Sequence, residues 1–222
     1  MGILYRFPKL YAYITENFLY DEFETESFAA LLQIKDLKPN AIIMDLACGS
    51  GEFVMELAAQ RPDIKVIGID FSSEMIEKCI KTAQDKALKN AYFVSQPILS
   101  LSANDITQIV GKVSDPVVQL DIVVCSYGFS AMDDHYADIF KHTASLLRPG
   151  GYYIISDAYY TQRKWFTRFF QYIIDNILLD AKMFRKPWRL LEQHLDDFII
   201  HEKPLKWFGT PINLYVARGQ KK

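Results

Sequence analysis

The stretch from Ile42 to Phe53 reads IIMDLACGSGEF and decides the fold. A mostly apolar run leads into two glycines, Gly49 and Gly51, which are separated by one residue. Glycine adopts backbone conformations that other residues avoid, and it lets a ligand come close to the backbone. The stretch therefore predicts a buried strand that ends in a tight turn against a ligand.

Short apolar strands and helices alternate from residue 40 onward. The predicted strands are residues 41–47, 65–70, 91–95, 120–126 and 151–158, and the predicted helices are 52–60, 72–88 and 133–147. This alternation is typical of a parallel sheet with right-handed crossovers. After Tyr160 the pattern changes. An aromatic helix, a second helix and two strands are predicted at 164–184, 188–195, 197–205 and 212–219, and the two strands are close enough in sequence to pair as a hairpin.

The chain has 222 residues, which is enough for one α/β domain and too few for two comfortable ones. We expect a single globular domain. Residues 1–38 are rich in aromatic and acidic side chains, and their apolar spacing predicts an N-terminal helical cap segment ahead of the main domain at 39–222.

The overall charge and the cysteines limit the function classes. The net charge is -2, so there is no electrostatic reason to expect a nucleic-acid partner. The three cysteines, Cys48, Cys79 and Cys125, form no close pair, which argues against a disulfide framework or a zinc site. Cys48 and Cys125 are expected to be buried small side chains. No apolar run has the length of a membrane span, and the first residues lack the pattern of a secretory signal, so we expect a cytoplasmic protein.

The second predicted strand ends at Asp70, about 20 residues after the glycine turn. A carboxylate at this position accepts hydrogen bonds from ribose hydroxyls in nucleotide-binding folds. The alternative is that Asp70 caps the helix that starts near Ser72. A nicotinamide enzyme would need a third glycine near residue 54, where this chain has Phe53 and Val54. A nicotinamide dinucleotide, whose pyrophosphate would lie against the glycine turn, is therefore disfavoured as the ligand.

Four segments occur in an order and spacing that point to one family. They are MDLACGSGEF, VIGIDFSSEMI, LDIVVCSYGFSAMDD and LLRPGGYYIISD, within residues 40–157. The chain resembles the class I S-adenosylmethionine (SAM)-dependent methyltransferases, and in particular the group of small-molecule and quinone-biosynthesis methyltransferases. The resemblance implies an α/β, Rossmann-like three-layer sandwich. Its sheet would be mostly parallel and seven-stranded, with an antiparallel terminal strand.

The resemblance also implies a cofactor site for S-adenosyl-L-methionine, with S-adenosylhomocysteine as product. The implied cofactor-binding residues are Asp45, Ala47, Gly49, Gly51, Asp70, Phe71, Met75, Gln96 and Ser126. Asp45 would offset the positive charge of the cofactor, and Phe71 and Met75 would lie near the adenine. Gln96 departs from the family, which often has an acid there, but an amide can still bond the adenine edge.

Methyl transfer to a phenol or an acidic carbon benefits from a base. The catalytic candidates are Tyr127 and His135, with Tyr11 or Tyr20 closing over the site as a lid. The Asp-Asp-His run at 133–135 is compatible with a base or a metal site, but an exposed helix N-terminus explains its two acids equally well. We expect no metal.

Residues 165–178 form an aromatic and aliphatic helical stripe. The stripe either packs on the sheet, roofs the active site, or contacts a membrane surface or lipid-like substrate. The acceptor is expected to be a small or lipid-like molecule, and the sequence does not specify the oligomeric state. Three functions stay open: a methyltransferase, another transfer from SAM or a nicotinamide enzyme, and a noncatalytic protein that keeps the fold.

Overall fold

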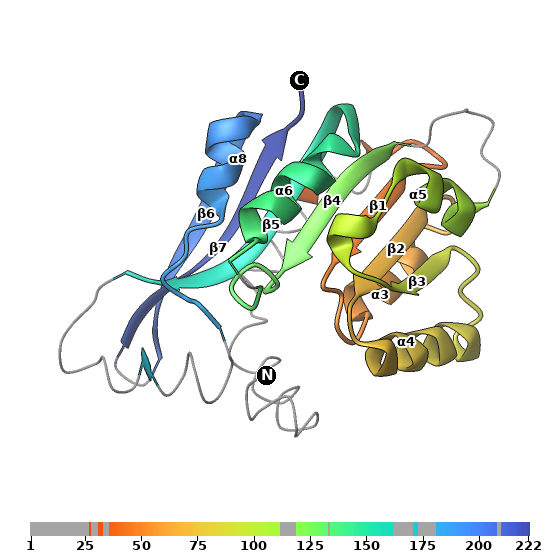
Figure 1. Ribbon diagram of the computed structural model, residues 1–222, viewed down its shortest axis with the longest axis horizontal. Helices are drawn as coiled ribbons and strands as arrows, with labels where there is room; N and C mark the ends of the chain where they lie inside the picture. The colour runs from red at the N-terminus through yellow and green to blue at the C-terminus, as the bar shows by residue number, and fades with distance from the viewer. Residues whose placement is uncertain are drawn as a thin grey trace.

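The computed structural model describes residues 27, 31–32, 36–111, 119–132, 134–161, 171–172, 181–207 and 210–222. Its elements are β1 (Ile42–Leu46), α3 (Glu52–Gln60), β2 (Lys65–Asp70), α4 (Ser73–Asp85), β3 (Ala91–Ser95), the short 3-10 helix η3 (Ile98–Ser100), α5 (Ala103–Val110), β4 (Leu120–Ser126), α6 (Tyr136–Ser145), β5 (Leu147–Tyr160), α8 (Trp188–His194), β6 (Asp196–Trp207) and β7 (Thr210–Gln220). Figure 1 shows their arrangement.

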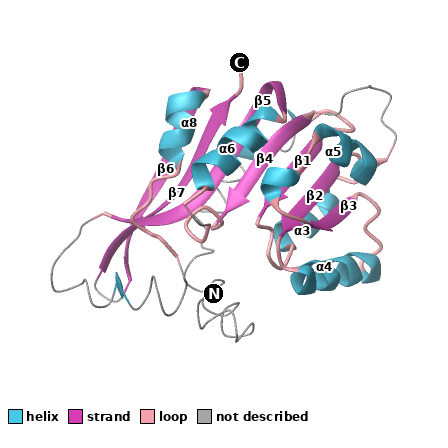
Figure 2. Cartoon of the chain, in the orientation of Figure 1, coloured by secondary structure: helices cyan, strands magenta, loops and turns pink. Residues whose placement is uncertain are grey.

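The strands in the described part of the chain form one seven-stranded sheet in the order β3-β2-β1-β4-β5-β7-β6. Strand β1 pairs in parallel with β2 and β4, and β4 pairs in parallel with β5. Strand β7 runs antiparallel to both of its neighbours, β5 and β6 (Figure 2). The predicted fold class is therefore confirmed, including the reversed terminal strand.

Helices cover both faces of the sheet, with α6 and α8 in front of the strands and α3 behind them in Figure 1. Side chains of α5, α6 and α8 share a buried cluster with Met44 and Tyr153. Side chains of α3 share a second cluster with Ile43 and Val216 on the opposite face. The sheet is thus the middle layer of a three-layer sandwich.

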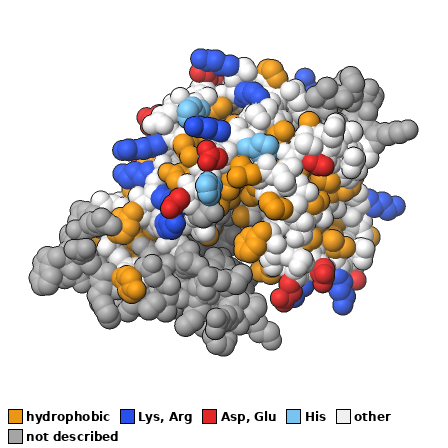
Figure 3. All heavy atoms as spheres, in the orientation of Figure 1, with side chains coloured by type: hydrophobic (Ala, Val, Ile, Leu, Met, Phe, Trp, Pro, Cys, Tyr) orange, Lys and Arg blue, Asp and Glu red, His pale blue; other side chains and the backbone are white. Residues whose placement is uncertain are grey.

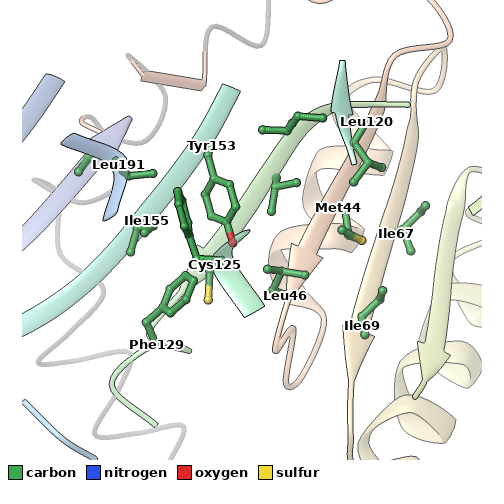
Figure 4. Close-up of a cluster of buried hydrophobic side chains, with 14 of the residues drawn as sticks. Met44, Leu46, Ile67, Ile69, Leu120, Cys125, Phe129, Tyr153, Ile155 and Leu191 are labelled. Atoms are coloured by element: carbon green, nitrogen blue, oxygen red, sulfur yellow. The ribbon is translucent and has the colours of Figure 1, made fainter. Parts of the chain in front are cut away.

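The larger cluster contains side chains of the central strands and of α5, α6 and α8. Figure 4 shows part of it around Tyr153 and Cys125. Tyr153 of β5 is fully buried, and its ring centroid lies 4.9 Å from that of Phe140 in α6. Its hydroxyl is 2.9 Å from the hydroxyl oxygen of Thr143, which satisfies both polar groups in the core. Packing of this kind fixes β4 and β5, and therefore the position of the loops that follow them.

One helix was missed by the sequence patterns. No helix was predicted in residues 97–119, between the strands at 91–95 and 120–126, but α5 lies there. Ser102 caps this helix: its hydroxyl oxygen accepts from the Asp105 N–H at 3.2 Å, and the Asp105 carboxylate accepts from the Ser102 N–H at 2.7 Å. The Ser-x-x-Asp spacing is a capping-box pattern, so a signal was present in the sequence.

Several sequence predictions fall mainly outside the described residues. Leu31 and Leu32 are helical and buried, and the Leu31 carbonyl accepts a hydrogen bond from Arg218 Nη1 at 3.2 Å. Tyr11 and Tyr20 lie outside the described part, as does nearly all of the 165–178 stripe. The boundary at residue 38 stays a prediction. No helix among the described residues is long and apolar enough to cross a membrane.

Candidate functional site

The turn after β1 is held in a conformation that favours glycine. Ala47, Gly49 and Gly51 have φ angles of 56°, 52° and 71°. The Cys48 N–H donates to the Ile69 carbonyl at 3.0 Å, and the Gly51 N–H donates to the Cys48 carbonyl at 2.8 Å. The turn is therefore tied to β2 and leads directly into α3, as the quoted stretch predicted.

The two glycines of the turn have different surroundings. A Cβ atom at Gly51 would lie 2.6 Å from Phe93 Cε1 and 2.9 Å from Cys79 Sγ, which is too close. A Cβ atom at Gly49 would meet no heavy atom within 4 Å in the part of the chain that the structure describes. Gly51 thus allows α3 and the turn to pack against β3 and α4, whereas Gly49 leaves its outer side accessible to a ligand.

Asp70, at the end of β2, organises this turn. Its side chain is buried, and its Oδ2 accepts from the Gly49 N–H at 3.0 Å while its Oδ1 accepts from the Ser72 N–H at 2.9 Å. The N-cap of α4 is Ser72, whose hydroxyl accepts from the Met75 N–H at 3.3 Å. Asp70 is therefore not the helix cap. An ionised carboxylate has about four acceptor positions, and the bonds of Asp70 to described residues use two of them.

Asp45 is a second buried carboxyl group beside the turn. It lies on β1 opposite Gly68 of β2, and 4% of its surface is exposed. Burial raises the pKa of Asp45 well above its ordinary value, and the charge of Asp70 raises it further. A cation bound nearby would favour the ionised form of this group. Without such a cation, burial favours the neutral acid.

The predicted adenine contacts lie next to Asp70. Phe71 follows it directly and has 76% of its surface exposed. Ser95 pairs with Asp70 in the sheet, and its hydroxyl donates to the Phe71 carbonyl at 3.4 Å. Gln96, one residue further along, is therefore at the same edge, and Met75 lies partly buried in the first turn of α4. An exposed aromatic ring beside a carboxylate and an amide can hold a nucleoside.

The end of β4 approaches the turn from the other side. Asp45 pairs with Val124, so Ser126, the last residue of β4, and Tyr127 after it lie at the same edge as the turn. A Cβ atom at Gly128 would lie 3.1 Å from Ala47 Cβ, so the two loops are in close contact. Tyr127 has a φ of 52°, which is uncommon for a residue with a side chain and is found most often at functional sites.

His135 lies at the N-terminus of α6, directly after Asp134. Its side chain is 68% exposed, and its Nδ1 is 3.5 Å from Asp138 Oδ2. Asp133 lies outside the described residues. Within the described ranges, no cluster of three His, Cys, Asp or Glu side chains could hold a metal ion. The role of His135 as a base stays a prediction.

The cysteines lie beneath the turn and the central strands. Cys125 is buried, as expected, whereas Cys48 was expected to be buried and is only half-buried. Cys79 is buried as well. Cys79 donates to the Gly49 carbonyl at 3.3 Å, and burial raises the pKa of its thiol to about 11. A thiol with such a high pKa is a poor nucleophile, so the packing role is the better account of Cys79.

Two features near the carboxyl edge of the sheet were not predicted from the sequence. Asp157 of β5 is buried, and its carboxylate accepts from the Ser130 and Ala158 N–H groups, each at 2.8 Å. Burial raises the pKa of Asp157 to about 6. The second feature is an ion cluster in which Lys182 and Arg185 contact Asp134. The sequence motif IISD contained the buried acid, but nothing in the sequence linked residue 134 to residue 185.

Known proteins that are similar to this chain include a methyltransferase family and several curated relatives. A family model described as a methyltransferase domain matches residues 37–190, more than half of the chain. Demethylmenaquinone methyltransferase of Lactococcus lactis is 27% identical over 161 residues, which cover 70% of this chain and 59% of that protein. Carboxy-S-adenosyl-L-methionine synthase of Aliivibrio fischeri is 31% identical over 137 residues, which cover 60% and 51%. The chain thus spans less than two thirds of these curated relatives.

Solved structures share the fold. Magnesium protoporphyrin IX methyltransferase from Synechocystis PCC 6803, with bound SAH, has a TM-score of 0.58 at 17% identity, covering 90% of this chain and 83% of that chain. Phosphoethanolamine N-methyltransferase 2 of Haemonchus contortus, in complex with S-adenosyl-L-methionine, has a TM-score of 0.69 at 12% identity, covering 95% and 56%. At these identities the likeness concerns the fold.

Proposed function

Since the chain belongs to the class I SAM-dependent methyltransferases, a family whose cofactor is SAM, we propose that it transfers a methyl group to a small or lipophilic molecule by in-line displacement. The observation that carries this proposal is the buried carboxylate of Asp70. It accepts from the Gly49 N–H of the turn and keeps acceptor positions for a ribose.

The residues at this edge fit the cofactor. Gly49 has open space on its outer side, and Phe71 exposes an aromatic face beside Asp70. In our proposal the turn from Asp45 to Gly51 holds the amino-acid portion, Asp70 holds the ribose, and Phe71, Met75 and Gln96 surround the adenine. Burial raises the pKa of Asp45, and a sulfonium bound nearby would lower that pKa again, so in our proposal Asp45 becomes a charge partner when the cofactor binds.

Bound SAM supplies a methyl group that is already activated by its sulfonium. The chain then has to align an acceptor and exclude water rather than form a covalent intermediate. We propose that Ser126 and Tyr127, at the end of β4, take part in this task, and the close approach of Gly128 to Ala47 of the turn supports this role. We propose Tyr127 and His135 as the groups that bind or deprotonate the acceptor, with Tyr11 or Tyr20 as a lid.

The class of acceptor is supported by relatives. Among the proteins similar to this chain are a demethylmenaquinone methyltransferase and a magnesium protoporphyrin IX methyltransferase, and both are named for small or lipophilic acceptors. Relatives named as tRNA methyltransferases match a shorter part, about 35% of the chain. The net charge of -2 also favours a small-molecule acceptor over nucleic acid.

A second candidate is another group transfer that uses SAM. The similarity to a carboxy-S-adenosyl-L-methionine synthase favours it, because that name describes chemistry on the cofactor itself. A noncatalytic binding protein with this fold is the third. Incubation with SAM carrying a labelled methyl group, with and without a panel of quinols and phenols, separates them. Label in an acceptor supports methyl transfer, and a modified cofactor without labelled acceptor supports the second candidate.

The proposal also includes the cellular compartment of the protein. We place the protein in the cytoplasm, where its three cysteines would stay reduced, as the structure has them free. The stripe at 165–178 is proposed to touch a membrane surface or a lipid-like acceptor. Sedimentation with vesicles of anionic lipid tests the contact, and a protein that stays in the supernatant at low salt would contradict it.

A further inference from the structure

Two cationic side chains converge on one point beside the loop that follows β4. Lys182 Nζ lies 3.0 Å and Arg185 Nη2 lies 2.5 Å from the same oxygen, Asp134 Oδ1. Positively charged hydrogen-bond donors that point at the same position bind carboxylate and phosphate oxygens. In the chain as described, that point is taken by a carboxylate of the protein itself.

Arg185 is held in place by contacts that do not involve Asp134. Its Nη1 donates to the Met132 carbonyl at 2.7 Å, and its guanidinium lies 4.6 Å above the centre of the Tyr136 ring. Only 12% of its side chain is exposed. Its position would therefore persist if Asp134 moved away, and a guanidinium so little hydrated needs an anion nearby.

Asp134 is held much less firmly. Its side chain is 89% exposed, and ion pairs at such exposed positions contribute little to stability. The hydrogen bond and charge of Lys182, followed by those of Arg185, hold the pKa of Asp134 below its ordinary value, so the group is an anion at neutral pH. An external anion can replace this carboxylate while Arg185 stays in place.

The cluster is attached to the loop that follows β4. The loop that carries Asp134 starts at the end of β4, beside Tyr127. The Lys182 N–H donates to the Ser130 carbonyl of this loop at 2.6 Å, so the segment with both cations is attached to it. Figure 3 shows basic and acidic side chains beside hydrophobic ones on the face that carries α6 and α8.

We propose that Lys182 and Arg185 bind a carboxylate or phosphate group of the methyl acceptor, and that Asp134 occupies this anion site when the acceptor is absent. That the anion belongs to the acceptor rests on the proposed function. The anion site itself does not, since it follows from the converging donors. The proposal narrows the acceptor to small molecules that carry one anionic group.

Calorimetric titration with inorganic phosphate, and separately with acetate, tests the anion site. Asp134→Asn is expected to bind the preferred anion about tenfold more tightly than the wild type, because an internal competitor is removed. Lys182→Met and Arg185→Met are expected to bind it at least about tenfold more weakly. Arg189→Met is the matched control, because Arg189 is exposed on α8 and outside the cluster.

The outcomes separate the two proposals. Each variant is also titrated with S-adenosylhomocysteine, whose site uses other residues, so retained binding shows an intact fold. Anion affinity that is unchanged in Asp134→Asn, or equal in Lys182→Met and Arg189→Met, overturns the anion site. Failure of the wild type to bind S-adenosylhomocysteine contradicts the proposed function instead. Tighter binding of phosphate or of acetate identifies which anionic group the acceptor carries. If Asp134→Asn binds neither anion, the proposed anion site is also overturned.

Discussion

The Asp70 carboxylate at the end of β2 accepts a hydrogen bond from the Gly49 N–H, 3.0 Å away in the turn that follows β1. This bond joins the two neighbouring strands at their carboxyl ends, where open α/β sheets bind ligands. The same carboxylate accepts from the Ser72 N–H at the start of α4. One side chain thus fixes the turn and the helix start, and it retains acceptor positions for a ligand.

Asp70→Asn is expected to weaken S-adenosylhomocysteine binding by about tenfold or more, because an amide loses the charge and offers an N–H where an acceptor is needed. Calorimetric titration measures the loss. Asp85→Asn, at the exposed end of α4, is the control and should bind normally. Equal affinity in the two variants would show that Asp70 does not contact the ribose.

Gly51→Ala and Gly49→Ala should separate stability from binding. The alanine at position 51 would clash with Phe93 at a φ of 71°, and we expect a loss of roughly 2–4 kcal/mol in the free energy of unfolding. The alanine at position 49 has space and should cost only about 1–2 kcal/mol. Urea unfolding checks both values.

Gly49→Ala, the less destabilised of these two variants, is the one expected to lose affinity for the cofactor through a direct clash with it. Gly49→Ala adds a methyl group on the open side of the turn, so its affinity for S-adenosylhomocysteine should fall although the fold is largely retained. If Gly49→Ala is as destabilised as Gly51→Ala and binds normally, the open side of the turn is not the ligand side.

The raised pKa of Asp157 predicts that the stability of the protein depends on pH. Burial raises its pKa from 3.8 to about 6, so its contribution to stability is complete below pH 3.8 and is lost as the pH rises through 6. Asp157→Asn removes this titration. The unfolding free energy of the wild type, measured relative to that of Asp157→Asn, should fall by roughly 2 kcal/mol between pH 4 and pH 8. A constant difference across this range would mean that the buried carboxyl does not titrate there.

Once an acceptor is found, the two proposed bases can be distinguished. Tyr127→Phe keeps the ring and removes the hydroxyl, and we expect turnover to fall by about a hundredfold if the hydroxyl takes part in proton transfer. His135→Ala should change the pH profile of turnover. If turnover of His135→Ala equals that of the wild type at every pH, His135 is not the base, which its exposed position beside Asp138 would explain.

The fold was predictable because its signals are local. Strands β2, β3 and β4 and helix α3 match their predicted ranges, since each is a short apolar run or an amphipathic stretch between turn residues. Helix α6 is shorter than expected, Tyr136–Ser145, and β5 begins earlier, at Leu147. Helix α5 was missed because a capping box is a weaker signal than a glycine turn.

The site was only partly predictable. Asp70 could be found because it ends a strand at a fixed distance from the glycine turn. The cluster of Asp134, Lys182 and Arg185 could not, because about 50 residues separate Asp134 from Lys182 and Arg185, and only the packing of the folded chain brings them together. Asp157 was overlooked because its burial depends on neighbouring elements rather than on its own strand.

The most direct test of the account is calorimetric titration of the purified protein with S-adenosylhomocysteine, with NADH as the parallel control. The account predicts micromolar binding of S-adenosylhomocysteine, loss of most of that affinity in Asp70→Asn, and no binding of NADH. Binding of NADH, or of neither ligand, would contradict the assignment of the turn between β1 and α3 to a sulfonium nucleoside.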